Sequence, residues 1–400
     1  MKSILYITHD GLNDHIGSSQ ILPYIYKASQ YHKYWILSVE KDFQKIANLK
    51  QTLTDHKNIN WVPIKYPKAS IFGFILETIK MISISSNIIR QNKIDIIHCR
   101  CYPGTIVGVL VKMLTFMHSP KLLFDIRDFW LDTRIDTRNN KSIYKFLKLF
   151  ESLMYKYSDG YITLTEKAKE IIINKFNLSR DKDLITVIPC CADFKLFDRS
   201  KIERADKIEL LESLRINSNK FVLGYLGSLG PDYLLKEMLD VFFQIKALKE
   251  NSIFLVITNT PEYAKDLILE DSRFTENDFR VISGNRDEMP LYISLFDLSL
   301  VFIRPALSKS GCSPTKVAEL LSMNVPIIAN KGVGDLDALF SIKRNCSVTI
   351  KLPIELDEIK GFLNSLEDHP DKSFIRNNSH SLSLENGARQ YLKAYNTFYD

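Results

Sequence analysis

The sequence predicts an α/β protein with two parallel sheets, each covered by helices. Short runs rich in Val, Ile, Leu, Phe and Tyr alternate along the whole chain with longer stretches of helical periodicity, an alternation typical of parallel sheets. The chain has 400 residues, more than one hydrophobic core usually organises. A highly charged segment, 201–215, separates two groups of alternating elements. We therefore expect two α/β domains joined by a linker at 201–215.

The first half is expected to form a Rossmann-like domain of seven strands with helices between them. Its predicted strands are the apolar runs at 4–8, 34–39, 59–62, 94–99, 121–125, 160–164 and 184–188. Its predicted helices are the periodic stretches at 21–31, 72–91, 104–115, 143–157 and 165–176.

The second half repeats the pattern with six predicted strands, which gives a second Rossmann-like sheet. The strands are expected at 221–225, 253–257, 279–282, 298–302, 325–329 and 347–350. The helices are expected at 234–249, 261–269, 290–295, 314–322, 334–340 and 356–366, with a final amphipathic helix at 384–399. The expected organisation is a first domain at 1–200, a second at 201–383 and a C-terminal helix at 384–400 that packs on the first domain.

Composition places the chain among ordinary globular proteins. Apolar residues make up 45% and charged residues 25% of the chain. The N-terminal apolar run reaches His9 and Asp10 too early for a cleaved signal peptide, and stretch 71–89, which carries Glu77 and Lys80, is not expected to span a membrane. The six cysteines lack the spacing of a zinc site. These observations predict a cytoplasmic protein with reduced thiols and no metal site.

The two halves differ in charge. Residues 1–200 contain 29 Lys and Arg against 19 Asp and Glu, a net charge of +10, whereas the remainder has 24 against 28, a net charge of −4. The basic half suggests an anionic partner, which could be a phosphorylated acceptor, an anionic membrane surface or nucleic acid, although a solvated basic surface explains the charge equally well. Stretch 141–156 could lie on anionic lipid or pack within its domain. No recognised nucleic-acid-binding module is present, so nucleic acid is not an expected partner.

Stretch 308–337 is the strongest candidate for an anion site. Ser313 is expected to cap a helix with Pro314 at its first position, which directs free backbone N–H groups at an anion. Lys316 follows one turn later, and Glu319 lies on the same helical face. The cation could hold a phosphate and the carboxylate could hold sugar hydroxyls. On these residues alone, an ordinary capped helix with a surface ion pair is an equally good interpretation.

Further residues are expected to join this anion site. Gly227 and Ser228 follow the first strand of the second domain, where a glycine loop could cradle phosphate. Arg304 and Lys309 could join Lys316 in neutralising a diphosphate without a metal ion. In the first domain, Gly17 would allow close approach of a ligand at a helix entry. No dinucleotide fingerprint occurs, so no nicotinamide cofactor, and no other cofactor, is expected.

Polar residues end two consecutive predicted strands of the first domain. His98 and Arg100 end the fourth strand, and Asp125, Arg127 and Asp128 end the fifth. Carboxyl ends of neighbouring parallel strands face one crevice, which suits a substrate hydroxyl. A buried structural histidine and a structural Asp–Arg ion pair remain open alternatives.

Together these features resemble the GT-B glycosyltransferases, and most closely the retaining glycosyltransferase family 4. The resemblance runs over nearly the full chain. It rests on Asp10-Gly11, Gly17-x-x-Gln20-Ile21-Leu22-Pro23, Ile97-His98-x-Arg100, Phe124-Asp125-Ile126-Arg127, Leu164-Thr165-Glu166, Val187-Ile188-Pro189 and Ser313-Pro314-Thr315-Lys316-x-x-Glu319.

The resemblance implies two Rossmann-like domains that face a central cleft, with the last helix crossing back to the first. It implies metal-independent transfer of a sugar from a nucleotide-sugar to a glycan or lipid-linked acceptor in polysaccharide or glycoconjugate biosynthesis, in the cytoplasm or at the inner face of the plasma membrane. The implied catalytic residues are His98, Asp125 and Arg127, and the implied acceptor-binding residues are Arg100 and Asp128. The implied donor-binding residues are Gly17, Gly227, Ser228, Arg304, Lys309, Ser313, Lys316 and Glu319.

The chain departs from the family pattern at three places. Gly311 stands where a sugar-facing Glu is common, Ser228 and Leu234 replace an Arg and a Lys, and Arg127 replaces a histidine after the fifth strand. Two alternatives therefore stay open beside the transferase. One is a nucleotide-sugar 2-epimerase of the same architecture, and the other is a non-catalytic scaffold that binds a sugar nucleotide.

Overall fold

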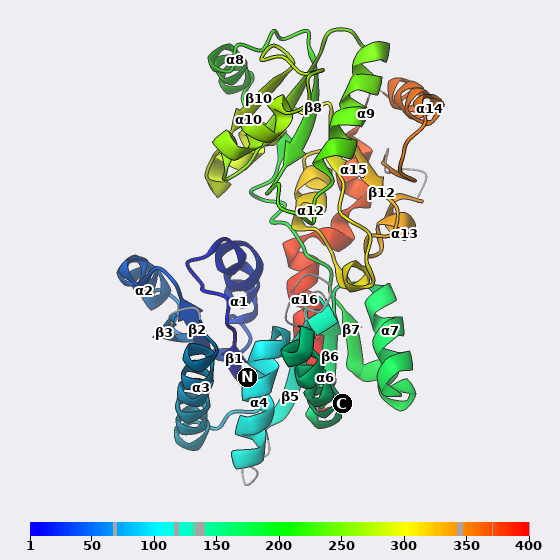
Figure 1. The fold of residues 1–400 in the computed structure, drawn as a ribbon. Coiled ribbons are helices and arrows are strands. Elements are labelled where there is room, and N and C mark those ends of the chain that lie inside the picture. The colour runs from blue at the N-terminus through cyan, green and yellow to red at the C-terminus, as the bar shows by residue number, and fades with distance from the viewer. Residues whose placement is uncertain are drawn as a thin grey trace. The chain divides into compact units, whose positions relative to one another are not determined.

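The computed structural model describes residues 1–66, 70–115, 120–129, 131–132, 141–341, 347–369 and 371–399. The chain forms two compact units (Figure 1). The first unit comprises Met1–Cys190, Ser310–Cys312 and Leu384–Asp400, and the second comprises Cys191–Lys309 and Ser313–Ser383. The C-terminal segment therefore belongs to the same unit as the N-terminal half.

The first unit is built on a seven-stranded parallel sheet of order β3-β2-β1-β4-β5-β6-β7, and all seven predicted strands are confirmed. The central strands are buried on both faces because helices cover both sides of the sheet, whereas the edge strands β3 and β7 are partly exposed. The strands are β1 (Ser3–Ile7), β2 (Lys33–Glu40), β3 (Ile59–Lys65), β4 (Ile96–Arg100), β5 (Lys121–Ile126), β6 (Gly160–Thr163) and β7 (Ile185–Val187).

The helices of this unit follow the predicted pattern with one addition. They are α1 (Leu22–Ala28), which a π-helical turn at Gly17–Ile21 precedes, α2 (Ile46–Thr54), α3 (Ile71–Gln91), α4 (Cys101–Leu114), α6 (Lys141–Tyr157), α7 (Glu166–Phe176) and α16 (Leu384–Asn396). Helix α2 was not predicted, although Ile46, Leu49 and Leu53 recur at helical spacing; the helix is short and only Ile46 and Leu53 of its side chains are buried. Helix α16 packs beside α1.

The second unit has a six-stranded parallel sheet of order β10-β9-β8-β11-β12-β13. Its core contains Phe242, Phe254 and Phe274 between the sheet and its helices. All six predicted strands are confirmed: β8 (Phe221–Leu226), β9 (Ser252–Ile257), β10 (Phe279–Ile282), β11 (Leu298–Val301), β12 (Ile327–Asn330) and β13 (Val348–Ile350).

The helices of the second unit include two that differ from expectation. The predicted linker at 201–215 is wrong, since Arg204–Ser213 forms α8, a charged helix whose one buried residue is Leu211. Helix α15 is a further unpredicted short helix. The set is α8, α9 (Leu235–Leu248), α10 (Pro261–Leu269), α11 (Met289–Ile293), α12 (Thr315–Ser322), α13 (Leu336–Phe340), α14 (Leu356–Glu367) and α15 (Ser373–Asn378).

Each sheet reverses its strand order at one position. In the first unit the chain moves outward from β1 to β2 and β3 and then returns to place β4 on the other side of β1. In the second unit the same reversal lies between β8 and β11. Ligands of open parallel sheets bind at the carboxyl ends of the strands beside such a switch point. These two positions are where a site is expected in each unit.

Candidate functional site

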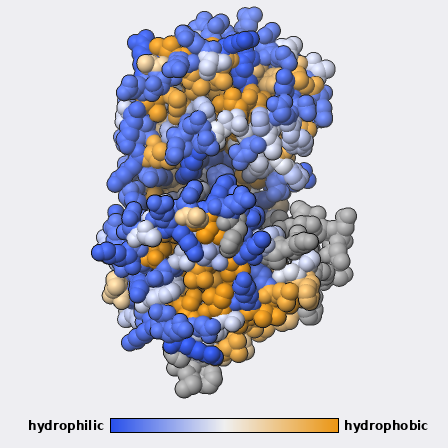
Figure 2. Space-filling view, turned by 90° about the vertical axis from the view of Figure 1, so that its left-hand side faces the viewer, coloured by the Kyte–Doolittle hydropathy of each residue, from blue (hydrophilic) through white to orange (hydrophobic). Residues whose placement is uncertain are grey.

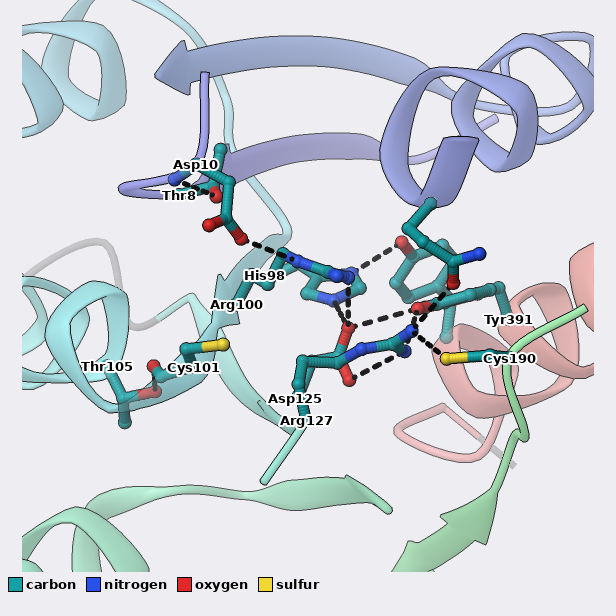
Figure 3. A network of polar contacts seen from close by, with 12 residues as sticks. Thr8, Asp10, His98, Arg100, Cys101, Thr105, Asp125, Arg127, Cys190 and Tyr391 are labelled. Carbon is teal, nitrogen blue, oxygen red and sulfur yellow. Dashed lines mark hydrogen bonds and ion pairs between the residues drawn. The ribbon is translucent and has the colours of Figure 1, made fainter. Parts of the chain in front are cut away.

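At the switch point of the first unit, polar side chains from β4 and β5 meet the C-terminal helix (Figure 3). His98 accepts or donates at both ring nitrogens: Nδ1 lies 2.7 Å from the Tyr395 hydroxyl and Nε2 lies 3.3 Å from Asp125 Oδ2. The Tyr391 hydroxyl donates to the same Asp125 oxygen over 3.0 Å. The strand ends are therefore bonded to two tyrosines of α16.

Two arginines complete this cluster. Arg127 Nη1 lies 3.4 Å from Asp125 Oδ1 and donates to the Tyr391 hydroxyl over 3.2 Å. Arg100 donates through Nε to Asp10 over 3.0 Å, and its Nη1 lies 3.9 Å from Asp125 Oδ2. The cluster thus centres on the Asp125 carboxylate.

Asp125 is held as an anion in a place closed to solvent. Burial alone would raise the pKa of its carboxyl, but the charge of Arg127, the hydrogen bond from His98 and the charge of Arg100 hold this pKa well below its usual range. Burial lowers the pKa of His98, which favours the neutral ring despite the neighbouring carboxylate. Burial also raises the pKa of Tyr391 well above its ordinary value, so that hydroxyl stays a donor.

The predicted catalytic residues of the first unit lie beneath the protein surface. His98 and Asp125 are fully buried and Arg127 is 7% exposed. Their hydrogen bonds go to protein groups, including Gln20 and Cys190 for Arg127. These hydrogen bonds hold the ends of β4 and β5 against the C-terminal helix α16. Of the two predicted acceptor-binding residues, Arg100 is also buried, whereas Asp128 is partly exposed.

Gly17 has a role within the loop that follows β1. A Cβ at this position would lie 2.1 Å from the carbonyl oxygen of Gly11 and 2.4 Å from Cα of Leu12. The buried carboxylate of Glu40 holds the same loop, because it accepts the backbone N–H of Leu12 over 2.8 Å and that of Asn13 over 3.3 Å. Gly17 therefore allows two backbone segments of the loop to pack directly on each other.

At the switch point of the second unit, a lysine from α12 lies over the glycine loop that follows β8. Gly227 has a φ of +131°, and a Cβ added to it would lie 2.5 Å from Lys316 Nζ. Lys316 Nζ lies 4.6 Å and 4.5 Å from the ring centroids of Tyr225 and Tyr233. Lys316 Nζ also donates to the Tyr225 hydroxyl over 3.5 Å, and the cation–π contacts help to hold this lysine beside the loop. Ser228 lies exposed on this loop, where its carbonyl accepts the Tyr225 hydroxyl.

The other two predicted cations reach the same loop. Lys309 Nζ lies 2.9 Å from Asp232 Oδ2, and the backbone N–H of Arg304 donates to the carbonyl of Asp232 over 2.8 Å. The Arg304 residue is exposed, whereas Lys309 is partly buried. The structure thus brings Lys309, Lys316 and the backbone of Arg304 to the loop between β8 and α9.

The predicted cap of α12 is corrected by one residue. The helix begins at Thr315 and its N-cap is Pro314, which has extended torsions and makes no side-chain cap. Ser313 lies just outside the helix, because Pro314 has ψ 120° instead of a helical value. The N–H groups of the first turn still belong to Thr315, Lys316 and Val317, so the direction of the helix dipole is unchanged.

Glu319 has a partner that the sequence did not suggest. Its carboxylate is 7% exposed and accepts from Arg286 Nη1 over 3.0 Å. Arg286 comes from the turn between β10 and α11, and its guanidinium lies 5.3 Å from the ring centroid of Phe197. Arg286 therefore fixes one oxygen of the carboxylate that was predicted to hold sugar hydroxyls of a donor. Among the described residues, no group of three or more His, Cys, Asp or Glu is arranged to hold a metal ion.

Comparison with known proteins finds a matching family and a curated relative that each cover part of the chain. The model of Glycosyltransferase Family 4 matches residues 32–196, which is less than half of the chain. A chitobiosyldiphosphodolichol beta-mannosyltransferase from Debaryomyces hansenii is 23% identical over 243 residues, covering 57% of this chain and 51% of that protein. The chain thus spans about half the length of this curated relative.

Two solved structures match nearly the whole chain. A glycosyltransferase from Rickettsia africae has a TM-score of 0.71 at 14% identity, with 99% of this chain and 98% of that chain covered. Anabaena Alr3699/HepE in complex with UDP-glucose has a TM-score of 0.71 at 15% identity, with 99% and 100% covered.

The fold is the GT-B fold of glycosyltransferases. The predicted resemblance to glycosyltransferase family 4 is confirmed by the family model. In this GT-B protein, sequence reasoning missed Glu40, Arg286, Tyr391 and Tyr395, which touch predicted site residues only through the tertiary structure. A carboxylate at the end of β2 and tyrosines four residues apart in an amphipathic helix were the available signals.

Proposed function

We propose that this GT-B protein is a retaining glycosyltransferase that moves a hexose from a nucleotide-sugar to a glycan or lipid-linked acceptor. The reaction would belong to polysaccharide or glycoconjugate biosynthesis. The observation that carries this proposal is the placement of Lys316 and Glu319 on the first turns of α12, at the switch point of the second unit. A cation beside a glycine loop and a carboxylate one turn later suit a diphosphate and a ribose.

The names of similar proteins support the same donor and acceptor classes. One solved structure contains UDP-glucose, and the curated relative is named as a mannosyltransferase for a chitobiosyldiphosphodolichol. We take a nucleotide-sugar as the donor class and a lipid-linked glycan as one acceptor class for this chain. A lipid-linked acceptor would place the enzyme in the cytoplasm at the inner face of a membrane.

In the proposed reaction, the bond between the anomeric carbon and the diphosphate oxygen breaks as the acceptor oxygen bonds to that carbon on the same face. The acceptor proton passes to the departing diphosphate. Lys316, Arg304 and the positive end of the α12 dipole stabilise the charge that develops on the diphosphate. Glu319 binds the ribose hydroxyls with the carboxylate oxygen that Arg286 leaves available. No metal ion or cofactor is required in this scheme.

We assign His98, Asp125 and Arg127 a positioning role in place of the predicted contact with the reacting atoms. Their burial and their bonds to α16 support this assignment. The proposed acceptor-binding groups are the partly exposed Asp10 and Asp128. The buried Arg100, at the end of β4, is proposed to act on the acceptor side through its hydrogen bond to Asp10.

The experiment that tests the proposal is a thermal-shift panel of nucleotide-sugars, followed by incubation of the stabilising donor with lipid-linked and free glycans. A donor that binds the folded state raises Tm by mass action. We expect stabilisation by one donor class and a transferred sugar whose anomeric configuration, read by NMR, equals that of the donor. Release of a changed free sugar from the donor alone would instead favour the 2-epimerase. Binding without hydrolysis or transfer would favour the scaffold, and no stabilisation by any nucleotide-sugar would contradict all three.

A further inference from the structure

Helix α3 carries large apolar side chains on its outward face along its first two turns. Phe72, Ile75, Leu76 and Ile79 recur at the spacing i, i+3, i+4 and i+7, which places them on one side of the helix. They are 70%, 48%, 51% and 57% exposed. We call these four residues the α3 stripe. Figure 2 shows an apolar patch on the side of the first unit where α2 and α3 lie in Figure 1.

The α3 stripe is unusual because the same helix already has a buried apolar face. Met81, Ile88 and Ile89 pack into the core of the first unit. A surface helix of a globular protein normally turns one apolar stripe inward and polar residues outward. Single exposed apolar residues need no explanation, but four on adjacent turns form a patch of the kind that marks an interaction surface.

The exposed charged side chains of α3 itself and of the end of β3 are basic. The exposed charged residues of α3 are Lys80 and Arg90, and Lys65 is exposed at the end of β3. The helix contains one carboxylate, Glu77, which is 5% exposed and lies 2.6 Å from His9 Nδ1. An apolar stripe flanked by exposed cations, with its acidic group withdrawn, matches the anionic headgroups and acyl boundary of a lipid bilayer.

The contact with His9 also fixes where the α3 stripe lies. His9 follows β1, and its ring centroid is 5.7 Å from that of Phe74 in addition to its contact with the Glu77 carboxylate. The first turns of α3 are therefore tied to the carboxyl end of β1, the edge that carries Asp10 and Arg100. The stripe lies beside the edge of the sheet on which acceptor binding is proposed.

We propose that the α3 stripe is a membrane-docking surface that inserts into the headgroup–acyl boundary of an anionic bilayer. The inference extends the proposed function by naming the surface that brings a lipid-linked acceptor to the first unit. Phe72–Gln91 is long and apolar enough to cross a membrane. However, this helix packs on the sheet through Met81, Ile88 and Ile89, and it contains the ionisable Glu77 and Lys80. Both features favour a helix that lies on the bilayer over one that crosses it.

This docking surface differs from the one suggested by sequence. The candidate stretch 141–156 forms part of α6, but the side chains of 141–147 lie outside the described residues. The described part of α6 contributes Met154 and Tyr155 to the core of the first unit. The same part of α6 exposes Phe150 and Leu153, which are 42% and 41% exposed, beside the exposed Lys156. The α3 stripe has four apolar side chains that are each at least 48% exposed, so it is the stronger candidate among the described residues.

The test is sedimentation of the full chain with vesicles of equal parts phosphatidylglycerol and phosphatidylcholine. The test variant is F72S/L76S/I79S, and the matched control is L110S/M113S/L114S, which removes three exposed apolar side chains from α4 of the same unit. We expect the wild type and the control to bind, and the α3 variant to lose at least about tenfold in partitioning. Binding should persist in part at about 0.5 M salt, because apolar insertion is not screened.

A second measurement needs no variant. Hydrogen exchange of the wild-type chain should show vesicle-dependent protection of peptides covering 72–79 and none in peptides covering 110–114. This readout does not require catalysis, so it separates failure of docking from failure of the proposed transferase activity.

Four results would overturn the inference. The first two are that the wild type does not bind vesicles and that the control variant loses as much binding as the α3 variant. The third is that the bound protein resists alkaline carbonate extraction, which indicates a spanning helix. The fourth is that the wild type forms a dimer without binding vesicles and that the α3 substitutions convert this dimer to a monomer. The last result would assign the α3 stripe to contact with a second copy of the chain.

Discussion

The hydroxyl of Tyr391 donates to Asp125 Oδ2 over 3.0 Å and so bonds the C-terminal helix to the end of β5. The two residues are separated by 266 positions in the chain. Their contact lies inside a cluster with His98, Arg100 and Arg127 at the switch point of the first sheet. A helix at the far end of the sequence is therefore part of the structure that holds the proposed acceptor side.

Replacing Tyr391 by Phe tests this bond directly. The ring still fits, but Asp125 and Arg127 each lose a buried hydrogen-bond partner, so we expect a loss of about 1–3 kcal/mol in the free energy of unfolding. Urea unfolding measures it. Tyr399→Phe is the control, because Tyr399 donates to Asp95 O at an exposed position. Equal stability of Tyr391→Phe and wild type would show that the bond does not support the fold.

The Asp125→Asn substitution separates a positioning role from a catalytic one. It removes the anion that Arg100 and Arg127 face in a buried site, and an uncompensated buried charge typically costs about 3–5 kcal/mol. We expect a large loss of stability by chemical unfolding. Asp42→Asn, at an exposed ion pair with Lys45, should leave stability unchanged. A variant with wild-type stability but no transfer activity would return Asp125 to the catalytic group.

Acid should destabilise the first unit in two stages. Burial lowers the pKa of His98 below its ordinary 6.5, so as the pH falls through that range the unfolded chain takes up a proton that the folded protein excludes. The pKa of Asp125 is also held below its ordinary value. The ionised Asp125 therefore stabilises the folded protein at any pH above that ordinary pKa, and this stabilisation is lost as the pH falls through the folded-state pKa. Both effects favour unfolding on acidification.

The first stage can be isolated with His98→Asn, which removes the titrating ring. Urea unfolding between about pH 5 and pH 7 should show stability rising with pH in the wild type, and this rise should be smaller in the variant. Parallel pH profiles for the two proteins would rule out His98 as the source.

Gly17→Ala tests the close packing of the loop after β1. The added methyl would meet the backbone of Gly11 and Leu12, which cannot move away as a side chain would. We expect a stability loss of about 1–3 kcal/mol. Gly230→Ala is the control, because no atom lies within 4 Å of a Cβ built there. If both variants unfold at the wild-type denaturant concentration, the loop tolerates a side chain at Gly17.

The sequence predicted most of the fold because both sheets consist of buried, nearly continuous apolar runs. All thirteen strands were located in this way, and the helices were found wherever one face is apolar. Helices α2 and α8 were missed for the opposite reason, since each buries at most two residues, and the many charged residues of α8 resemble a linker.

The candidate site was predicted less completely. Residues at strand ends, such as His98 and Asp125, were found because strand boundaries are local. Their burial beneath α16 depends on a contact between distant segments that periodicity does not encode. Arg286 was missed for the same reason, because the turn that carries it reaches Glu319 only in the folded second unit.

The central claim is that the second unit binds a nucleotide-sugar through Lys316 and Glu319. The most direct measurement is calorimetric titration of the stabilising donor into the wild type, Lys316→Ala and Glu319→Gln, with Lys265→Ala on α10 as a surface control. Since each site residue would make a charge-assisted bond to the donor, we predict at least about tenfold weaker binding for both site variants and unchanged binding for the control. Wild-type affinity in both folded site variants would contradict the account.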